Sequence, residues 1–136
     1  MYKYNTLKEK ISAEKAERNA RYEAFAKLWD TAWAEGVTAA NAAKPKPMVV
    51  MDGQGRQIDC VRDGMCGFAW LNVPGNTSFG RWLKKKGIAR PDYPTGLCVW
   101  IRAYEQSHDR EAAHAYAMAR YLQSQGIECS ARSRLD

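Results

Sequence analysis

The most regular pattern of apolar and polar positions in the chain begins at Leu97. An apolar run over residues 97–101 is followed by a polar break at 105–109, a helical pattern, and an alternating run over residues 127–135. A short apolar run is typical of a strand buried on both faces, whereas alternation is typical of a strand with one buried face. The last forty residues therefore predict a strand, a helix and a strand, on which we expect the rest of the fold to be built.

The predicted helix of this unit has recognisable ends. Ser107 or Asp109 can cap it by accepting a hydrogen bond from a free backbone N–H, and Gly126 follows its last residue, where glycine adopts a left-handed conformation most easily. Its apolar face is mostly small and consists of Ala112, Ala115, Met118, Ala119 and Leu122. Small side chains at helical spacing predict close packing against a sheet.

The N-terminal part of the chain predicts one long helix, capped by Thr6 and running to about Ala34. Gly36 ends or bends it, and residues 37–43 could add one or two short helical turns. Charged residues dominate positions 8–21. An apolar stripe begins at Tyr22 and continues through Phe25, Leu28, Trp29, Ala32 and Trp33. We expect the second half to dock on the body and the first half to project as an arm. That arm is either a helix held by charge pairs or a segment that meets a partner.

Pro45 and Pro47 stand in a Lys-Pro-Lys-Pro connector, which favours extended chain because proline disfavours helix at the preceding residue. We therefore predict a helical arm over residues 1–44, docked through its second half, and an α/β core over residues 45–136, together forming a single domain.

The middle of the chain predicts three strands and a helix. Residues 48–51 and 56–61 flank a turn at 52–55, which is a hairpin signal, and residues 66–73 form a third apolar run after a turn at Asp63-Gly64. Residues 79–86 predict a helix capped by Thr77 or Ser78 and closed by Gly87, followed by a loop over residues 90–96. The expected fold class is α+β: a single small sheet of about five strands, formed by a three-strand meander and a β-α-β unit, with two covering helices and the long N-terminal helix.

Composition narrows the class of protein. The 136 residues are 46% apolar, so the chain can bury a core. The sequence contains no stretch of about 18 apolar residues, which is the length needed to span a bilayer. The net charge of +6 makes DNA or RNA a candidate partner. The charged N-terminal helix and four irregularly spaced cysteines favour a cytoplasmic protein with reduced thiols, and without C-x-x-C spacing we expect no metal and no cofactor.

Two groups of basic residues are candidates for contact with nucleic acid or another partner. The first is a dense run near Trp82 and Tyr93, made of Arg81, Lys84, Lys85, Lys86 and Arg90. The second is the solvent-exposed face of the last predicted strand, which carries Arg132 and Arg134, with Arg102 across the sheet. Basic side chains with aromatic neighbours can hold phosphates and stack bases. Alternatively, Phe79, Trp82 and Leu83 are a buried stripe, and the lysines are its solvated side.

Catalytic signals are weak. Ser107, His108 and Asp109 are the residue types of a triad, but adjacent side chains at a helix start rarely converge as a triad requires. His108 is the candidate acid–base residue, and Glu105 with Glu111 forms no evident metal pair. We therefore predict no catalytic residues, and an enzyme remains the less favoured alternative.

Several segments of the second half resemble a family of small uncharacterised bacteriophage proteins. They are residues 66–73 with the Pro-Gly-Asn turn, residues 79–85, 99–101, 106–107 and 111–117, and the ending Ser-Arg-Leu-Asp. The resemblance covers roughly residues 45 to 136. It implies a phage setting, a location in the host cytoplasm, and an accessory role in binding a host or phage macromolecule.

Four functions follow as hypotheses. The favoured one is a phage accessory protein that binds a host or phage protein without catalysis, in host takeover or against host defence. The second is a nucleic-acid-binding protein that uses the basic surfaces. An enzyme with a histidine–carboxylate site and a virion structural component are the remaining alternatives.

Overall fold

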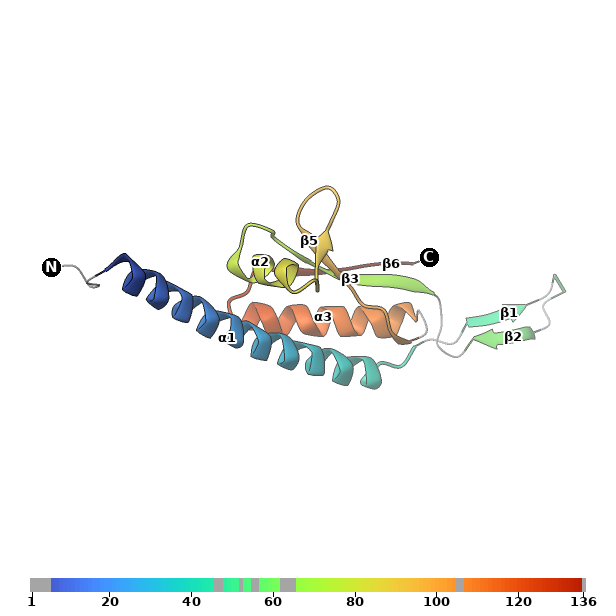
Figure 1. The fold of residues 1–136 in the computed structure, drawn as a ribbon. Coiled ribbons are helices and arrows are strands. Elements are labelled where there is room, and N and C mark those ends of the chain that lie inside the picture. Colours follow the sequence, from blue (N-terminus) through green and yellow to red (C-terminus); the bar gives the residue numbers. More distant parts are fainter. Residues whose placement is uncertain are drawn as a thin grey trace.

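A computed structural model describes residues 6–45, 48–51, 53–54, 57–61, 66–104 and 107–135 of the chain, with the backbone alone for strands 48–51 and 57–61. Its elements, in order, are α1 (Leu7–Ala42), β1 (Met48–Met51), β2 (Gln57–Val61), β3 (Gly67–Val73), α2 (Ser78–Lys85), β4 (Arg90–Pro91), β5 (Leu97–Trp100), α3 (His108–Ser124) and β6 (Ser130–Leu135). The prediction of an α+β fold with a long N-terminal helix is confirmed (Figure 1).

Four of the strands form an antiparallel sheet in the order β4-β5-β3-β6. β3 is central and pairs with β5 on one side and β6 on the other, while β4 pairs with the outer side of β5. From β3 onward the chain order is β-α-β-β-α-β, and each helix connects strands that flank another strand. This is the split β-α-β arrangement of ferredoxin-like folds. The predicted strand–helix–strand unit is β5-α3-β6, with β3 lying between its two strands.

The predicted hairpin of residues 48–51 and 56–61 is present, since β1 and β2 pair antiparallel. The prediction that it continues into a three-strand meander is wrong. Both neighbours of β3 in the sheet are other strands, so no edge of β3 is left for β2, and β1-β2 forms its own sheet. The predicted turn at Asp63-Gly64 lies outside the described residues. The predicted loop 90–96 begins with the short strand β4, which adds one strand to the main sheet. Because β1 and β2 form their own sheet, the main sheet has four strands, close to the prediction of about five.

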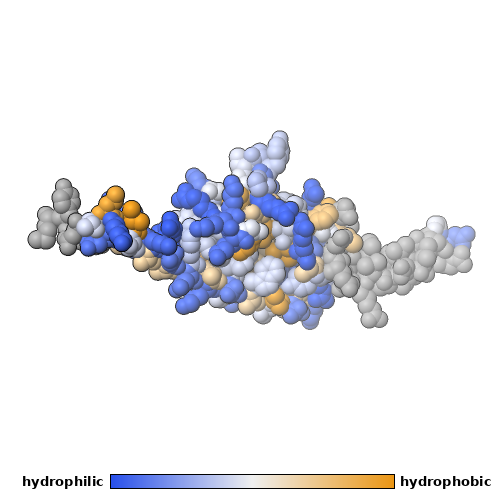
Figure 2. Space-filling view, in the orientation of Figure 1, coloured by the Kyte–Doolittle hydropathy of each residue, from blue (hydrophilic) through white to orange (hydrophobic). Residues whose placement is uncertain are grey.

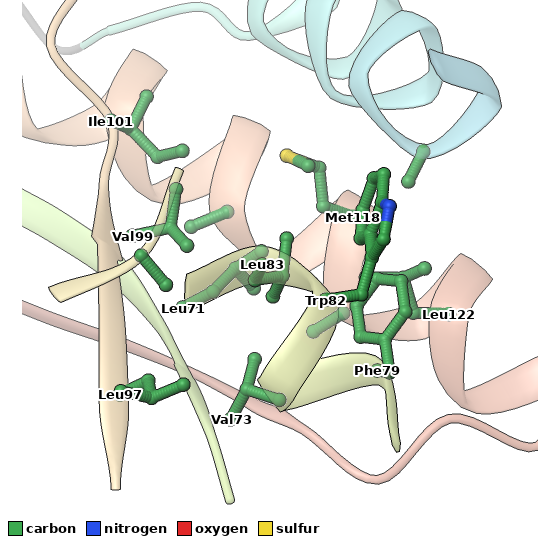
Figure 3. Packing of buried hydrophobic residues seen from close by; sticks show 14 of the residues in the cluster. Leu71, Val73, Phe79, Trp82, Leu83, Leu97, Val99, Ile101, Met118 and Leu122 are labelled. Atoms are coloured by element: carbon green, nitrogen blue, oxygen red, sulfur yellow. The ribbon is translucent and has the colours of Figure 1, made fainter. Parts of the chain in front are cut away.

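The helices cover one face of the four-stranded sheet, which we call the inner face. Side chains of β3 and β5, such as Leu71 and Val99, pack there against Leu83 of α2 and Met118 of α3 (Figure 3). α1 packs on the other side of α3. α3 is therefore buried on two sides, which explains why Ala115, Ala117 and Ala119 are all buried.

The N-terminal helix continues through Gly36 to Ala42, so the helical turns predicted after Gly36 belong to the same helix. Gly36 is buried, and a Cβ built on it would clash with Cδ2 of His114 in α3. Glycine is therefore needed for the close approach of two helices here and does not end the helix. Residues 7–21 are almost entirely exposed and project beyond the body as an arm (Figure 1).

The ends of α2 and α3 differ in how they are capped. Thr77 caps α2 as predicted, since its Oγ1 accepts a hydrogen bond from Gly80 N. Ser107 occupies the cap position of α3, but its side chain makes no capping hydrogen bond, so that part of the prediction is wrong. β6 begins at Ser130, three positions after the predicted start.

Candidate functional site

The second face of the sheet, which we call the outer face, carries large aromatic side chains. Along β3 the residues alternate between buried and half-buried, and Phe68, Trp70 and Asn72 are the half-buried positions. Successive side chains of a strand point to opposite faces. Since Leu71 and Val73 join the core, Phe68, Trp70 and Asn72 belong to the outer face. None of the three described helices packs there, because α2 and α3 bury their side chains in the inner-face core and α1 lies behind α3.

The strand register extends this face across the sheet. Trp70 lies directly opposite Trp100 of β5 on one side and Arg132 of β6 on the other. Residues directly opposite in antiparallel strands point to the same face. Two aromatic rings and a guanidinium therefore form one row across three strands.

The neighbouring rows continue this chemistry. Phe68 lies opposite Arg134, and Asn72 lies between Ser130 and Cys98, with Arg90 of β4 opposite Cys98. Three of the predicted contact residues, Arg90, Arg132 and Arg134, thus point to the same sheet face, and all three are exposed.

The aromatic side chains of the outer face contact one another. The ring centroids of Trp70 and Trp100 are 4.8 Å apart, and those of Phe68 and Trp100 are 6.0 Å apart at an interplanar angle of 85°. The guanidinium carbon of Arg134 lies 5.2 Å from the centroid of the Phe68 ring. These contacts hold three flat rings and one guanidinium in a continuous surface on adjacent strands.

The other predicted contact residues lie elsewhere. Arg81, Lys84, Lys85 and Lys86 are exposed on or beside α2, which packs on the inner face, while Phe79, Trp82 and Leu83 of the same helix are buried. The ammonium group of Lys85 lies 5.2 Å from the ring centroid of Tyr22 in α1. The arrangement therefore matches the alternative in which the lysines are the solvated side of a buried stripe.

A pocket of about 670 Å³ opens where β3 begins and β5 ends. Its lining includes Phe68 and Trp100 of the outer face, Arg102, Arg134, and Glu111 from the first turns of α3. Glu111 is only 3% exposed, and its Oε2 has no hydrogen-bond partner among the described residues. Burial raises the pKa of this carboxyl to about 7. The arrangement brings a buried acceptor, two cations and two aromatic rings together.

The two histidines do not share this pocket. Nδ1 of His108 lies 3.6 Å from the carboxylate of Asp109, and His108 is half-buried at the start of α3. His114 is fully buried, its Nδ1 is 2.7 Å from the Tyr104 hydroxyl, and burial lowers its pKa to about 4. His114 is therefore neutral at pH 7 and packs between helices, so the described residues place neither histidine beside Glu111 in the pocket.

Sequence reasoning missed the aromatic outer face and the position of Glu111 in the pocket lining. The segment Gly67 to Val73 was interpreted only as an apolar strand, although its large aromatic residues fall at every second position. That spacing, together with arginines at alternate positions of residues 130–135, could have identified one shared face. Strand alternation cannot predict the pocket, because Glu111 belongs to a helix on the opposite side of the sheet.

No protein-family model, curated protein or solved structure shows significant similarity to this chain. Among the described residues, no helix is long and apolar enough to cross a bilayer, and no cluster of three or more His, Cys, Asp or Glu side chains could hold a metal ion. The outer face and its pocket are therefore the candidate functional site.

Proposed function

We propose that this protein binds single-stranded nucleic acid on the outer face of its sheet. The observation that carries the proposal is the row formed by Trp100, Trp70 and Arg132 on adjacent strands, without a described helix over it. Flat aromatic side chains stack on unpaired bases, and each stacked base contributes about 1–3 kcal/mol. Four-stranded sheets with aromatic residues on the central strands are one established way of holding single-stranded RNA.

The cationic side chains fit the same ligand. Arg90, Arg132 and Arg134 flank the aromatic rings, and Arg102 lines the pocket at one end. A strand whose bases stack on the central rings would place its phosphates near these guanidinium groups. The formal net charge of +6 favours the approach of a polyanion.

The direct test is equilibrium binding of fluorescently labelled oligonucleotides, with single-stranded DNA, single-stranded RNA and duplex DNA as separate arms. We expect tighter binding of a single strand than of the duplex, because paired bases cannot lie flat on the sheet. Trp100→Leu should weaken this binding roughly tenfold. Tyr116→Ala is the matched control, since Tyr116 is an exposed aromatic residue of α3, and its affinity should equal that of the wild type. Absence of single-strand binding, or equal losses in the two variants, contradicts the proposal.

A second candidate function is non-catalytic binding of a host or phage protein, and the N-terminal arm favours it. Leu7 and Ile11 are 72% and 55% exposed, and their spacing of four residues places them on one side of the helix. Figure 2 shows a hydrophobic patch toward the outer end of the arm. An apolar pair on a projecting helix fits a protein groove. The test is affinity capture from infected cells with wild type and Leu7→Asp/Ile11→Asp. A protein partner that the variant loses supports this function, and identical captures oppose it.

For either function we propose a setting in the cytoplasm of an infected host cell, which is what the expected resemblance of residues 45 to 136 to small bacteriophage proteins implies. In that setting, single-stranded nucleic acid is an abundant ligand during replication and transcription.

A further inference from the structure

The pocket beside the outer face is lined by a residue with a polar atom that no described residue pairs with. Oε2 of Glu111 is buried and has no hydrogen-bond partner among the described residues. Buried polar atoms in folded proteins nearly always have a partner, because an unpaired one loses its hydration without compensation. Glu111 lines a pocket whose volume falls within the range of ligand sites. A ligand that donates hydrogen bonds to Glu111 would supply the missing partner.

The remaining lining restricts what that ligand is. Phe68 and Trp100 contribute aromatic rings that favour a flat group, and Arg102 and Arg134 contribute donors for acceptor atoms. The ligand should therefore be planar, with adjacent N–H donors on one edge and acceptors on another. Since the pocket adjoins the face proposed to bind single-stranded nucleic acid, a base of the bound nucleic acid would supply a planar group.

Among the bases, guanine best provides adjacent N–H donors on one edge and acceptors on another. Its N1–H and N2–H₂ groups form a pair of donors that matches the two oxygens of a carboxylate. Its O6 and N7 are both acceptors, and a bidentate arginine is their commonest partner in proteins. Adenine and cytosine each offer one exocyclic amine to a carboxylate, while thymine and uracil offer one ring N–H between two carbonyls that would repel it.

We propose that this pocket selects a guanine base of the bound strand, through hydrogen bonds from guanine N1–H and N2–H₂ to Glu111 and from Arg102 or Arg134 to guanine O6 and N7. The proposal rests on the proposed function, because the outer face supplies the strand that carries the base. Glu111 acts in it as the specificity-determining residue, and Trp100 and Phe68 supply the stacking surface.

The test compares ten-nucleotide single strands in binding titrations at pH 8, where Glu111 is mostly ionised because its pKa is about 7. The strands are oligo-dT and oligo-dT with one central guanine, adenine, cytosine or hypoxanthine, with matching uridine-based RNA strands. We expect the guanine strand to bind roughly tenfold more tightly than oligo-dT. Hypoxanthine lacks the N2 amine and should lose a large part of that gain.

The variant Glu111→Gln replaces one acceptor oxygen with an amide donor at nearly constant shape. It should bind oligo-dT as the wild type does and lose the guanine preference, while its circular dichroism and melting temperature show that it is folded. Arg102→Gln is a second test variant. Arg102 is exposed, so its substitution should not disturb the folding of the protein. It should reduce the guanine preference as well.

The outcomes separate this inference from the proposed function. If no single strand binds, the proposed function fails and the inference fails with it. If oligo-dT and the guanine strand bind equally, or the preference survives in both variants, the inference is overturned while the proposed function stands. A preference for another base, or binding of guanosine monophosphate without any strand binding, also overturns it.

Discussion

The guanidinium carbon of Arg134 lies 5.2 Å from the centroid of the Phe68 ring, across the β3–β6 pair. A cation over an aromatic face is attracted by the ring, and arginine can also stack through its own plane. This contact joins the two kinds of side chain that the outer face offers to a nucleic-acid strand. Arg134 therefore has two separable properties in the proposed interface, a positive charge and a planar guanidinium.

Substitutions at Arg134 separate these two properties. Arg134→Gln removes the charge, and the slope of log affinity against log salt should become less negative by about 0.7, the contribution of one phosphate contact to a single strand. Arg134→Lys keeps the charge, so it should retain the wild-type slope while binding more weakly at every salt concentration. Titrations at four or more salt concentrations measure both effects. Equal slopes for all three proteins would exclude Arg134 from phosphate contact.

Glu111 and His114 lie three residues apart in α3 and affect stability in opposite directions as pH changes. Burial raises the pKa of Glu111 from 4.5 to about 7 and lowers the pKa of His114 from 6.5 to about 4. Between pH 4.5 and 6.5, folded Glu111 holds a proton that the unfolded chain releases, so its contribution to stability falls as pH rises. Unfolded His114 binds a proton that the folded form lacks, so its contribution rises over the same range. The two contributions nearly cancel in the wild type.

Single substitutions should reveal each contribution. In Glu111→Gln, the free energy of unfolding should rise with pH relative to the wild type, by up to about 1.4 kcal/mol per pH unit between pH 5 and 6.5. In His114→Gln it should fall with pH by a similar amount. Urea unfolding at pH 5, 6 and 7 measures both, and titration of other groups cancels in the comparison. Parallel pH profiles for the three proteins would contradict the assignment.

Gly36 should be essential for the contact between α1 and α3. Alanine favours helix over glycine by about 1 kcal/mol, but its Cβ would clash with Cδ2 of His114. We expect Gly36→Ala to lower the free energy of unfolding by about 1–3 kcal/mol, because overpacking outweighs the helix preference. In a double-mutant cycle with His114→Ala, the loss caused by Gly36→Ala should disappear. Destabilisation that is independent of His114 would exclude this contact as the cause.

The sequence predicted the order of the elements better than their partners in space. Alternation and helical spacing identified the helices and strands from Leu97 onward, because those periods depend on local geometry. The separation of β1-β2 from the main sheet depends on β5 and β6 occupying both sides of β3, which is a non-local competition. From the sequence we expect Gly36 to end or bend α1. Its close contact with His114 arises only when α1 and α3 pack together, so the local sequence pattern does not predict it.

The candidate site was predictable in part for the same reason. Arg132 and Arg134 alternate along one strand, so their common face could be inferred from sequence. The lysines of α2 formed the denser basic run but lie on or beside a helix of the inner face. The apolar character of β5 suggested burial on both faces, whereas its half-buried Trp100 belongs to the outer aromatic surface. Hydrophobicity alone does not distinguish a core residue from a stacking residue.

The most direct measurement compares two charge-matched variants for affinity to a single-stranded oligonucleotide at one moderate salt concentration. Arg132→Glu/Arg134→Glu changes the outer face, whereas Lys84→Glu/Lys86→Glu makes the same change of net charge beside the solvated side of α2. If single-stranded nucleic acid binds on the outer face, the outer-face variant should lose at least about tenfold in affinity, while the affinity of the α2 variant should stay within about threefold of that of the wild type. Equal losses, or a larger loss in the α2 variant, would contradict binding on the outer face.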